Sequence, residues 1–314
     1  MSDQEQSSPW ARAKRWIAGH PVAAFLLVLY PLEWIIFTPA LLGKSGFGVI
    51  PALDIPYQIP LLLIAPLGLL ALPFLTTRLA DGQAGARALR GRYVHFRVGP
   101  QWYLAAVFGP PLVLMAAGLL TQGMAVLGPV ASNIARFPGL YFAMLIPTAL
   151  VANIWEEGAW AAFMTSRLQK RIGPVWASLA VAPCFGFVHI PLFFMVGGLT
   201  TTGRLPLSQF PLYAAILLFG YSAPVRILVT WLFNSTGGSV PIAALFHAAM
   251  DTAASAAVLA TFYPWSDGNI LYIGFAVIAV VLIVVTRGRL GYRRESPAAP
   301  EPSSPPRLAS TVEL

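Results

Sequence analysis

Eight segments of this chain are each long and apolar enough to cross a lipid bilayer as a helix. Such a helix needs about 20 mainly apolar residues, because the hydrocarbon core of a bilayer is about 30 Å thick. Charged residues make up 10% of the chain, against about 25% in a typical soluble protein, so lipid must cover most of its surface. The sequence therefore predicts an all-α, polytopic membrane helical bundle, with spans at residues 21–43, 57–77, 102–125, 138–165, 174–196, 209–234, 238–262 and 269–286.

The positions of Lys and Arg predict how this bundle is oriented, because cytoplasmic connections carry an excess of both residues. If both termini are cytoplasmic, only Lys44, Arg136 and Arg204 fall on the opposite side, and Arg226 lies within the sixth span. We therefore expect eight spans, cytoplasmic N- and C-termini and a location in the plasma membrane. The same distribution accounts for the net charge of +8 without nucleic acid as a partner, and membrane lipid is the partner expected.

The predicted spans divide the chain into five parts. These are a cytoplasmic tail (1–20), three helices (21–125), a core of helices four to seven (138–262), the last helix (263–290) and a Pro/Ser/Ala-rich tail expected to be disordered (291–314). The first apolar segment lacks an obvious cleavage site, so we expect a retained span and not a signal peptide. The single cysteine, Cys184, excludes an intrachain disulfide and a cysteine metal cluster.

Ionisable side chains inside the predicted spans gather in spans four to seven. Each costs about 2.5–3.5 kcal/mol on insertion scales, and such groups usually face a bundle interior. A helix rises about 1.5 Å per residue. At this rise, the ionisable side chains of spans four to seven lie at similar depths in the membrane, near its midplane or in its cytoplasmic half. A shared polar site is therefore predicted, and Glu33, alone in the first span, is expected to be structural or to pair with Arg226. The full set is Glu33, Glu156, Glu157, His189, Arg226, His247 and Asp251.

Helical spacing places several of these residues on common faces, because side chains four residues apart are neighbours. His247 and Asp251 have this spacing, so Asp251 is expected to orient the imidazole or to share its task. Phe185 and His189 also have it, so the aromatic ring is expected to wall the pocket of the histidine.

The two adjacent glutamates of the fourth span have a different relation. Glu156 shares a face with Trp160, four residues later. Consecutive residues of a helix point about 100° apart, so we expect that Glu156 and Glu157 do not both reach one point.

Two imidazoles and a carboxylate in a cleft with little water favour hydrolysis. A glutamate in apolar surroundings holds a proton more tightly than in water, so it can act as a general base near neutral pH. Histidines could stabilise the oxyanion or bind a metal that does so. Glu156, His189 and His247 form a possible ligand set for a divalent metal such as zinc, with an open coordination position. The sequence contains no HExxH and no GxSxG, which excludes a standard zincin site and a nucleophile elbow.

The polar residues resemble the motifs of the CPBP family, which joins type II CAAX prenyl endopeptidases with Abi-like and lysostaphin-resistance-like proteins. The family motifs are EExxxR, FxxxH and HxxxN or HxxxD. Here Glu156 and Glu157 open the first motif, FGFVH at 185–189 completes the second and HAAMD at 247–251 completes the third. The resemblance covers about residues 138–262.

The resemblance implies a helical membrane core that cleaves a peptide bond in a membrane-associated or lipidated protein. It implies that Glu156 activates water with support from Glu157, and that His189 positions this water. It also implies that His247 and Asp251 stabilise the oxyanion.

One position departs from the family pattern. The family arginine, five residues after the first glutamate, is Ala161 here. A buried charge without a partner is costly, so we expect Arg226, at comparable depth, to lie within reach of Glu156 or Glu157. The missing arginine leaves open a non-proteolytic immunity or scaffold protein. A proton-coupled transporter is a further alternative, although the chain lacks the paired broken helices of inverted-repeat carriers.

Overall fold

The computed structural model describes residues 8–199 and 204–293, and helices form nearly all of this part of the chain. The described residues contain no β-strand beyond one isolated bridge between Gly43 and Ile50. The predicted all-α class is therefore confirmed. Most of the predicted C-terminal tail lies outside the described residues.

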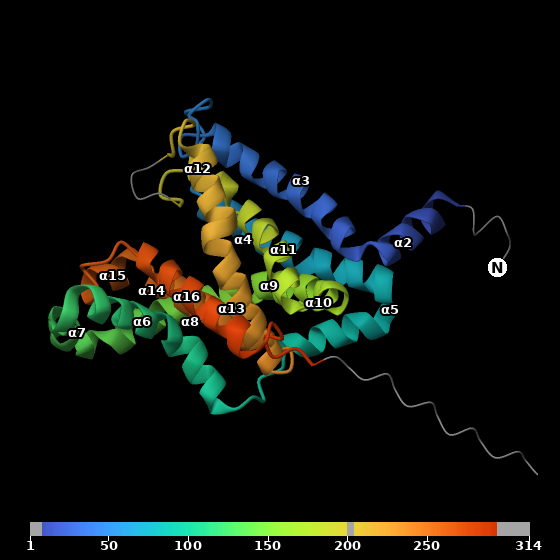
Figure 1. The fold of residues 1–314 in the computed structure, drawn as a ribbon. Helices are drawn as coiled ribbons and strands as arrows, with labels where there is room; N and C mark the ends of the chain where they lie inside the picture. The colour runs from blue at the N-terminus through green and yellow to red at the C-terminus, as the bar shows by residue number, and fades with distance from the viewer. Residues whose placement is uncertain (1–7, 200–203, 294–314) are drawn as a thin grey trace, which may run out of the picture.

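Most helices follow one another with few intervening residues, and residues 43–57 form a longer connection (Figure 1). The N-terminal part contains α2 (Pro9–Gly19), α3 (Pro21–Leu42), α4 (Gln58–Ile64), α5 (Leu72–Tyr93) and α6 (Pro100–Gln122). The middle contains α7 (Leu127–Asn133), α8 (Phe137–Thr148), α9 (Ile154–Glu157), α10 (Ser166–Ile172) and α11 (Pro174–Phe187). The C-terminal part contains α12 (Phe210–Ala215), α13 (Ser222–Ser235), α14 (Val240–Ala253), α15 (Ala256–Phe262) and α16 (Asn269–Val285).

Five helical stretches in the described part are long and apolar enough to cross a membrane, which makes this a multi-pass membrane protein. They are Pro21–Leu42, Gln58–Tyr93, Pro100–Ile172, Pro174–Phe194 and Phe210–Ser235. A sixth is added if α14 and α15, bent by 64°, form one span. The stretch Pro100–Ile172 contains two of the predicted segments, and α16 has 17 residues. The count of eight and the orientation of the termini therefore stay predictions.

Helix α16 shows how one element serves both the core and the lipid. Leu271, Phe275 and Leu282 are buried at helical spacing, and Phe275 packs against Phe246 of α14. The other face is apolar and exposed, with Ile273, Val277, Val280, Val281, Val284 and Val285. Water would disfavour such a continuous apolar face, whereas lipid tails cover it without penalty.

The hairpin of α13 and α14 forms the centre of the bundle. Helix α13 packs against α11, α14 and α16, and α14 also packs against α6, α8 and α9; Figure 1 shows α13 crossing the middle of the molecule. The turn between them uses Gly237 and Gly238, with φ of 66° and 88°, a region that glycine adopts without steric cost. Ser239 then caps α14 by accepting a hydrogen bond from the Ile242 amide (3.3 Å). This turn fixes the register between Arg226 and His247.

Wide helical turns flank the two glutamates. Residues Ala149–Asn153 and Gly158–Thr165 wind as π-helix on either side of α9. Such turns are rare and occur frequently at functional sites. The second segment is buried throughout, so its geometry is set by packing on all sides.

Gly158, at the start of this second segment, provides a test of that packing. A Cβ at residue 158 would overlap the hydroxyl and ring of Tyr93, which is buried. We expect Gly158→Ala to lower the free energy of unfolding by about 1–3 kcal/mol, as overpacking does. The midpoint of thermal unfolding of the detergent-purified protein measures this.

Gly91→Ala in α5 is the matched control. No atom lies within 4 Å of a Cβ built there, and alanine favours a helix interior over glycine. The midpoint of this variant should stay the same or rise. Equal losses in both variants would contradict the packing assigned to Gly158.

Candidate active site

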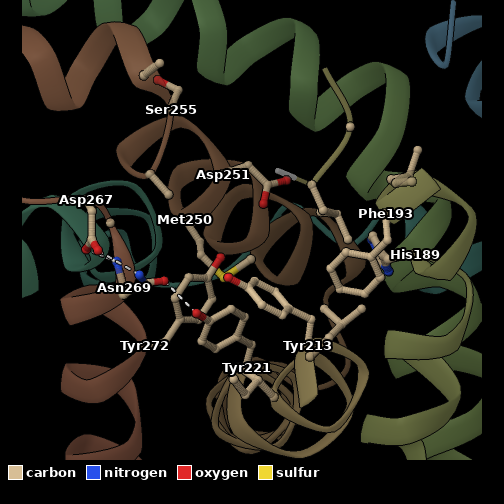
Figure 2. Close-up of a pocket in the computed structure, with 18 of the residues that line it drawn as sticks. His189, Phe193, Tyr213, Tyr221, Met250, Asp251, Ser255, Asp267, Asn269 and Tyr272 are labelled. Carbon is tan, nitrogen blue, oxygen red and sulfur yellow. Dashed lines mark hydrogen bonds between the residues drawn. The ribbon is translucent and has the colours of Figure 1, made fainter. Parts of the chain in front are cut away.

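A cavity of about 1320 Å³ lies between α11, α13, α14 and α16 and holds part of the predicted polar site. Phe185, His189, His247 and Asp251 all line it. Figure 2 shows Asp251 and His189 on one side of this cavity, opposite the aromatic side chains of Tyr213, Tyr221 and Tyr272. The cavity therefore combines a polar wall from α11 and α14 with an aromatic wall from the segment leading to α13 and from α16.

His247 connects this cavity to the two glutamates behind its wall. Its side chain is nearly fully buried. Nδ1 lies 2.9 Å from Glu157 Oε1 and 3.8 Å from Glu156 Oε2. On the other side of the ring, Nε2 lies 3.9 Å from Asp251 Oδ2. One imidazole therefore stands between three carboxylates, and an N–H at Nδ1 is placed to donate to Glu157.

The expectation that Glu156 and Glu157 would not reach one point is wrong. Both carboxylates approach the same nitrogen of His247. Both glutamates lie in the α-helical turn α9, so their Cα–Cβ bonds diverge as expected. The three rotatable bonds of each glutamate side chain nevertheless allow the two carboxylates to converge on His247.

Because the family arginine is absent, we expect Arg226 to lie within reach of the two glutamates. Its Nη1 donates to Glu157 Oε1 at 2.7 Å and Oε2 at 2.9 Å, so the expected contact is confirmed. Both side chains are fully buried. The cation reaches the carboxylate from α13, whereas residue 161 would have reached it from the helix of the glutamates themselves. The alternative pairing of Arg226 with Glu33 is wrong, and both Glu33 oxygens are buried without a hydrogen-bond partner in the described part of the chain.

Phe185 forms the contact between the histidines and the ion pair. Its ring centroid lies 4.9 Å from that of His189 and 5.4 Å from that of His247, both edge-on. The guanidinium carbon of Arg226 lies 5.4 Å from the same ring, a favourable cation–π distance. Trp160, fully buried, packs edge-on against Phe185 at 6.2 Å. Trp160 therefore supports the pocket from behind and does not line the cavity.

His189 and Asp251 complete the polar wall. Nδ1 of His189 lies 3.0 Å from the carbonyl oxygen of Phe185, which leaves Nε2 for groups in the cavity. Asp251 Oδ2 accepts a hydrogen bond from Asn153 Nδ2 at 3.1 Å, and 41% of the Asp251 side chain is exposed. The sequence interpretation missed Asn153. Its spacing three residues before Glu156 was the available signal, because residues so spaced share a helix face.

The predicted zinc ligands were tested against this geometry. Within residues 8–199 and 204–293, no group of three or more His, Cys, Asp or Glu is arranged to hold a metal ion. His247 presents Nδ1 to the glutamates, whereas His189 keeps Nε2 for groups in the cavity, so these donors are not gathered around one point. The donors Glu156, His189 and His247 therefore do not fit a metal ion in this arrangement.

Comparison with known proteins assigns a family to the core of the chain. Residues 138–253 match the family described as type II CAAX prenyl endopeptidase Rce1-like. A search of curated proteins finds no match. This match at residues 138–253 confirms the resemblance seen in the three motifs. The matched segment contains every residue of the polar cluster, namely Asn153, Glu156, Glu157, Phe185, His189, Arg226, His247 and Asp251.

The buried ion pair provides a test by double substitution. Arg226→Met leaves Glu157 buried without its cation, so we expect a loss of about 3–5 kcal/mol in the free energy of unfolding. Adding Glu157→Gln removes the uncompensated charge and should recover a large part of this loss. The measurement is denaturant unfolding of the two single variants and the double variant in detergent. Strictly additive losses would show that the two side chains do not interact.

Proposed function

We propose that this chain is an intramembrane endopeptidase of the CAAX-processing type, which hydrolyses a peptide bond of a membrane-associated or lipidated protein in the plasma membrane. The observation that carries the proposal is His247, whose ring joins a buried glutamate pair to a large cavity. All of these residues lie in the segment that matches a peptidase family. Neither glutamate lines the cavity, so the proposal requires that water from the cavity reach Glu156 beside His247.

The two glutamates differ in burial and in hydrogen bonding, and this difference supports a separate role for each. Glu157 is fully buried, and both of its oxygens accept hydrogen bonds from Arg226. Glu156 keeps 15% of its side chain exposed, and its Oε2 has no hydrogen-bond partner in the described residues. We therefore assign the general base to Glu156, and assign to Glu157 the task of holding His247 and Arg226.

The proposed reaction follows general acid–base hydrolysis. Glu156 takes a proton from water as the water oxygen bonds to the carbonyl carbon of the scissile peptide. The carbonyl oxygen becomes an oxyanion, which the Nε2–H of a protonated His247 stabilises, because the Nδ1–H of the same ring donates to Glu157. The C–N bond then breaks as Glu156 returns the proton to the leaving amine. His189, through Nε2, holds the water in the cavity before attack.

Asp251 is assigned a supporting task. An ionised carboxylate only accepts hydrogen bonds, so it stabilises an oxyanion directly only when it carries a proton. Its place 3.9 Å from His247 Nε2 suits it to orient the imidazole, and Asn153 fixes its carboxylate. Apo geometry at such sites commonly tightens when substrate binds.

Cleavage assays in membranes test this proposal. The chain is reconstituted in liposomes with a panel of membrane-tethered fluorogenic peptides, some lipidated near the C-terminus. Glu156→Gln and His247→Ala should lower the cleavage rate by about 100-fold or more, because a general base contributes about 10²–10⁴. Glu33→Gln is the matched control, since Glu33 is also buried in a membrane helix but lies outside the cluster.

Glu33→Gln should cleave the peptides within about twofold of the wild-type rate, because Glu33 takes no part in the proposed reaction. Wild-type activity in Glu156→Gln and His247→Ala would contradict the proposal, as would failure to cleave any peptide of the panel. A chelator should leave the rate unchanged, because the donors do not fit a metal ion. A loss reversed by added zinc would show that substrate rearranges these residues into a metal site.

A further inference from the structure

A second pocket, of about 610 Å³, lies where α10 ends and the chain folds back after α16. It is strongly basic: four of its lining side chains are cations and none is acidic. The lining consists of Gln169, Lys170, Arg171, Gly173, Arg289, Tyr292 and Arg293. The catalytic proposal uses none of these residues.

A pair of amides joins the two sides of this pocket. The side chains of Gln169 and Asn234 exchange two hydrogen bonds, each 3.0 Å long. Asn234 Nδ2 also donates to the carbonyl oxygen of Leu290 at 3.2 Å. The ends of α10 and α13 are therefore tied to the segment that carries Arg289 and Arg293.

The backbone of that segment is held in an uncommon conformation. Leu290 has a φ of 43° and is fully buried. A residue other than glycine persists in this region only when its surroundings hold it there. Here the Leu290 amide donates to Thr286 Oγ1 at 3.1 Å, and its carbonyl accepts from Asn234. Arg289 and Arg293 are thus fixed beside Lys170 and Arg171.

These cations contrast with other basic side chains of the protein. Lys44 pairs with Asp54, and Arg167 pairs with Asp81. None of the four pocket cations forms an ion pair with any residue of the described ranges. Like charges gathered in one place repel, and an anion that enters the pocket relieves this repulsion.

The position of the pocket identifies the source of the anion. Ile172 and Trp176 are exposed at the junction of α10 and α11, and Val284 and Val285 are exposed at the end of α16. In a membrane protein these apolar side chains face lipid, and tryptophan is typical of the interface. The pocket lies within a few residues of each, so it lies at the depth of lipid headgroups.

We propose that this pocket binds the phosphate of an anionic membrane lipid on the side of the membrane predicted to be cytoplasmic. Arginine and lysine side chains suit this ligand, and basic pockets between membrane helices bind such headgroups. The chain segment of Gln169 continues from that of Glu157, and Asn234 shares α13 with Arg226. A bound headgroup therefore fastens the same two helices that the Glu157–Arg226 pair joins.

The test measures lipid binding and stability on the purified full chain in a neutral detergent. Phosphatidylglycerol is titrated in, with phosphatidylcholine as the neutral lipid. The thermal midpoint and the bound lipid seen by native mass spectrometry are both recorded. We expect phosphatidylglycerol to raise the midpoint. Arg289→Gln/Arg293→Gln and, independently, Lys170→Gln/Arg171→Gln should each weaken binding by at least about tenfold.

Arg87→Gln/Arg90→Gln is the matched control, because it removes two exposed cations of α5 away from the pocket. The control should bind phosphatidylglycerol as the wild type does. Equal weakening in the control and the pocket variants would overturn the proposal, because binding would then be general surface charge. Absence of a phosphatidylglycerol effect on the wild type would also overturn it. If inorganic phosphate at millimolar concentration occupied the pocket as strongly as phosphatidylglycerol does, the assignment to a membrane lipid would be overturned.

Discussion

The ion pair between Glu157 and Arg226 is the interaction on which the arrangement of the site depends. Both side chains are fully buried, in a bundle whose outer surface faces lipid. A lone charge in such surroundings costs several kcal/mol, so removal of one partner of a buried pair is strongly destabilising. Each residue therefore requires the other, and this requirement fixes α9 against α13.

The pair also sets the tasks of its neighbours. Both Glu157 oxygens accept hydrogen bonds from Arg226. Glu156 is therefore the neighbouring carboxylate with an oxygen still able to accept a hydrogen bond. His247, held by Glu157 at one nitrogen, presents the other edge of its ring toward Asp251 and the cavity. Phe185 covers the guanidinium and touches both histidines. A single buried charge pair thus positions His247 and Phe185 at the wall of the cavity.

Much of this arrangement could be predicted from the sequence because it follows from helical spacing. The pairs Phe185/His189 and His247/Asp251 are four residues apart, and all four residues line one cavity. The replacement of the family arginine by Arg226 could also be predicted, since a buried carboxylate requires a cation and few were available.

Other features could not be predicted, and each has a physical reason. The convergence of Glu156 and Glu157 on His247 depends on the conformations of their long side chains, which packing selects and helical spacing does not show. Asn153 is uncharged, so a search for intramembrane charges passes over it. Hydropathy separates the segments 102–125 and 138–165 but does not show that the connection between α6 and α8 is itself helical. The basic pocket brings together α10 and the segment after α16, which are remote in sequence.

Water access to the polar wall of the cavity distinguishes a hydrolytic site from a sealed structural cluster. In a Cys184→Ser background, Asp251→Cys places a thiol where 41% of the native side chain is exposed, and Thr252→Cys places one at a buried neighbour. Thiol reagents modify accessible cysteines and spare buried ones. A charged, membrane-impermeant methanethiosulfonate applied to membrane fragments open on both sides should label Asp251→Cys and leave Thr252→Cys unmodified. Failure to label Asp251→Cys, with the folded protein present, would show that water does not reach this wall and would contradict hydrolysis there.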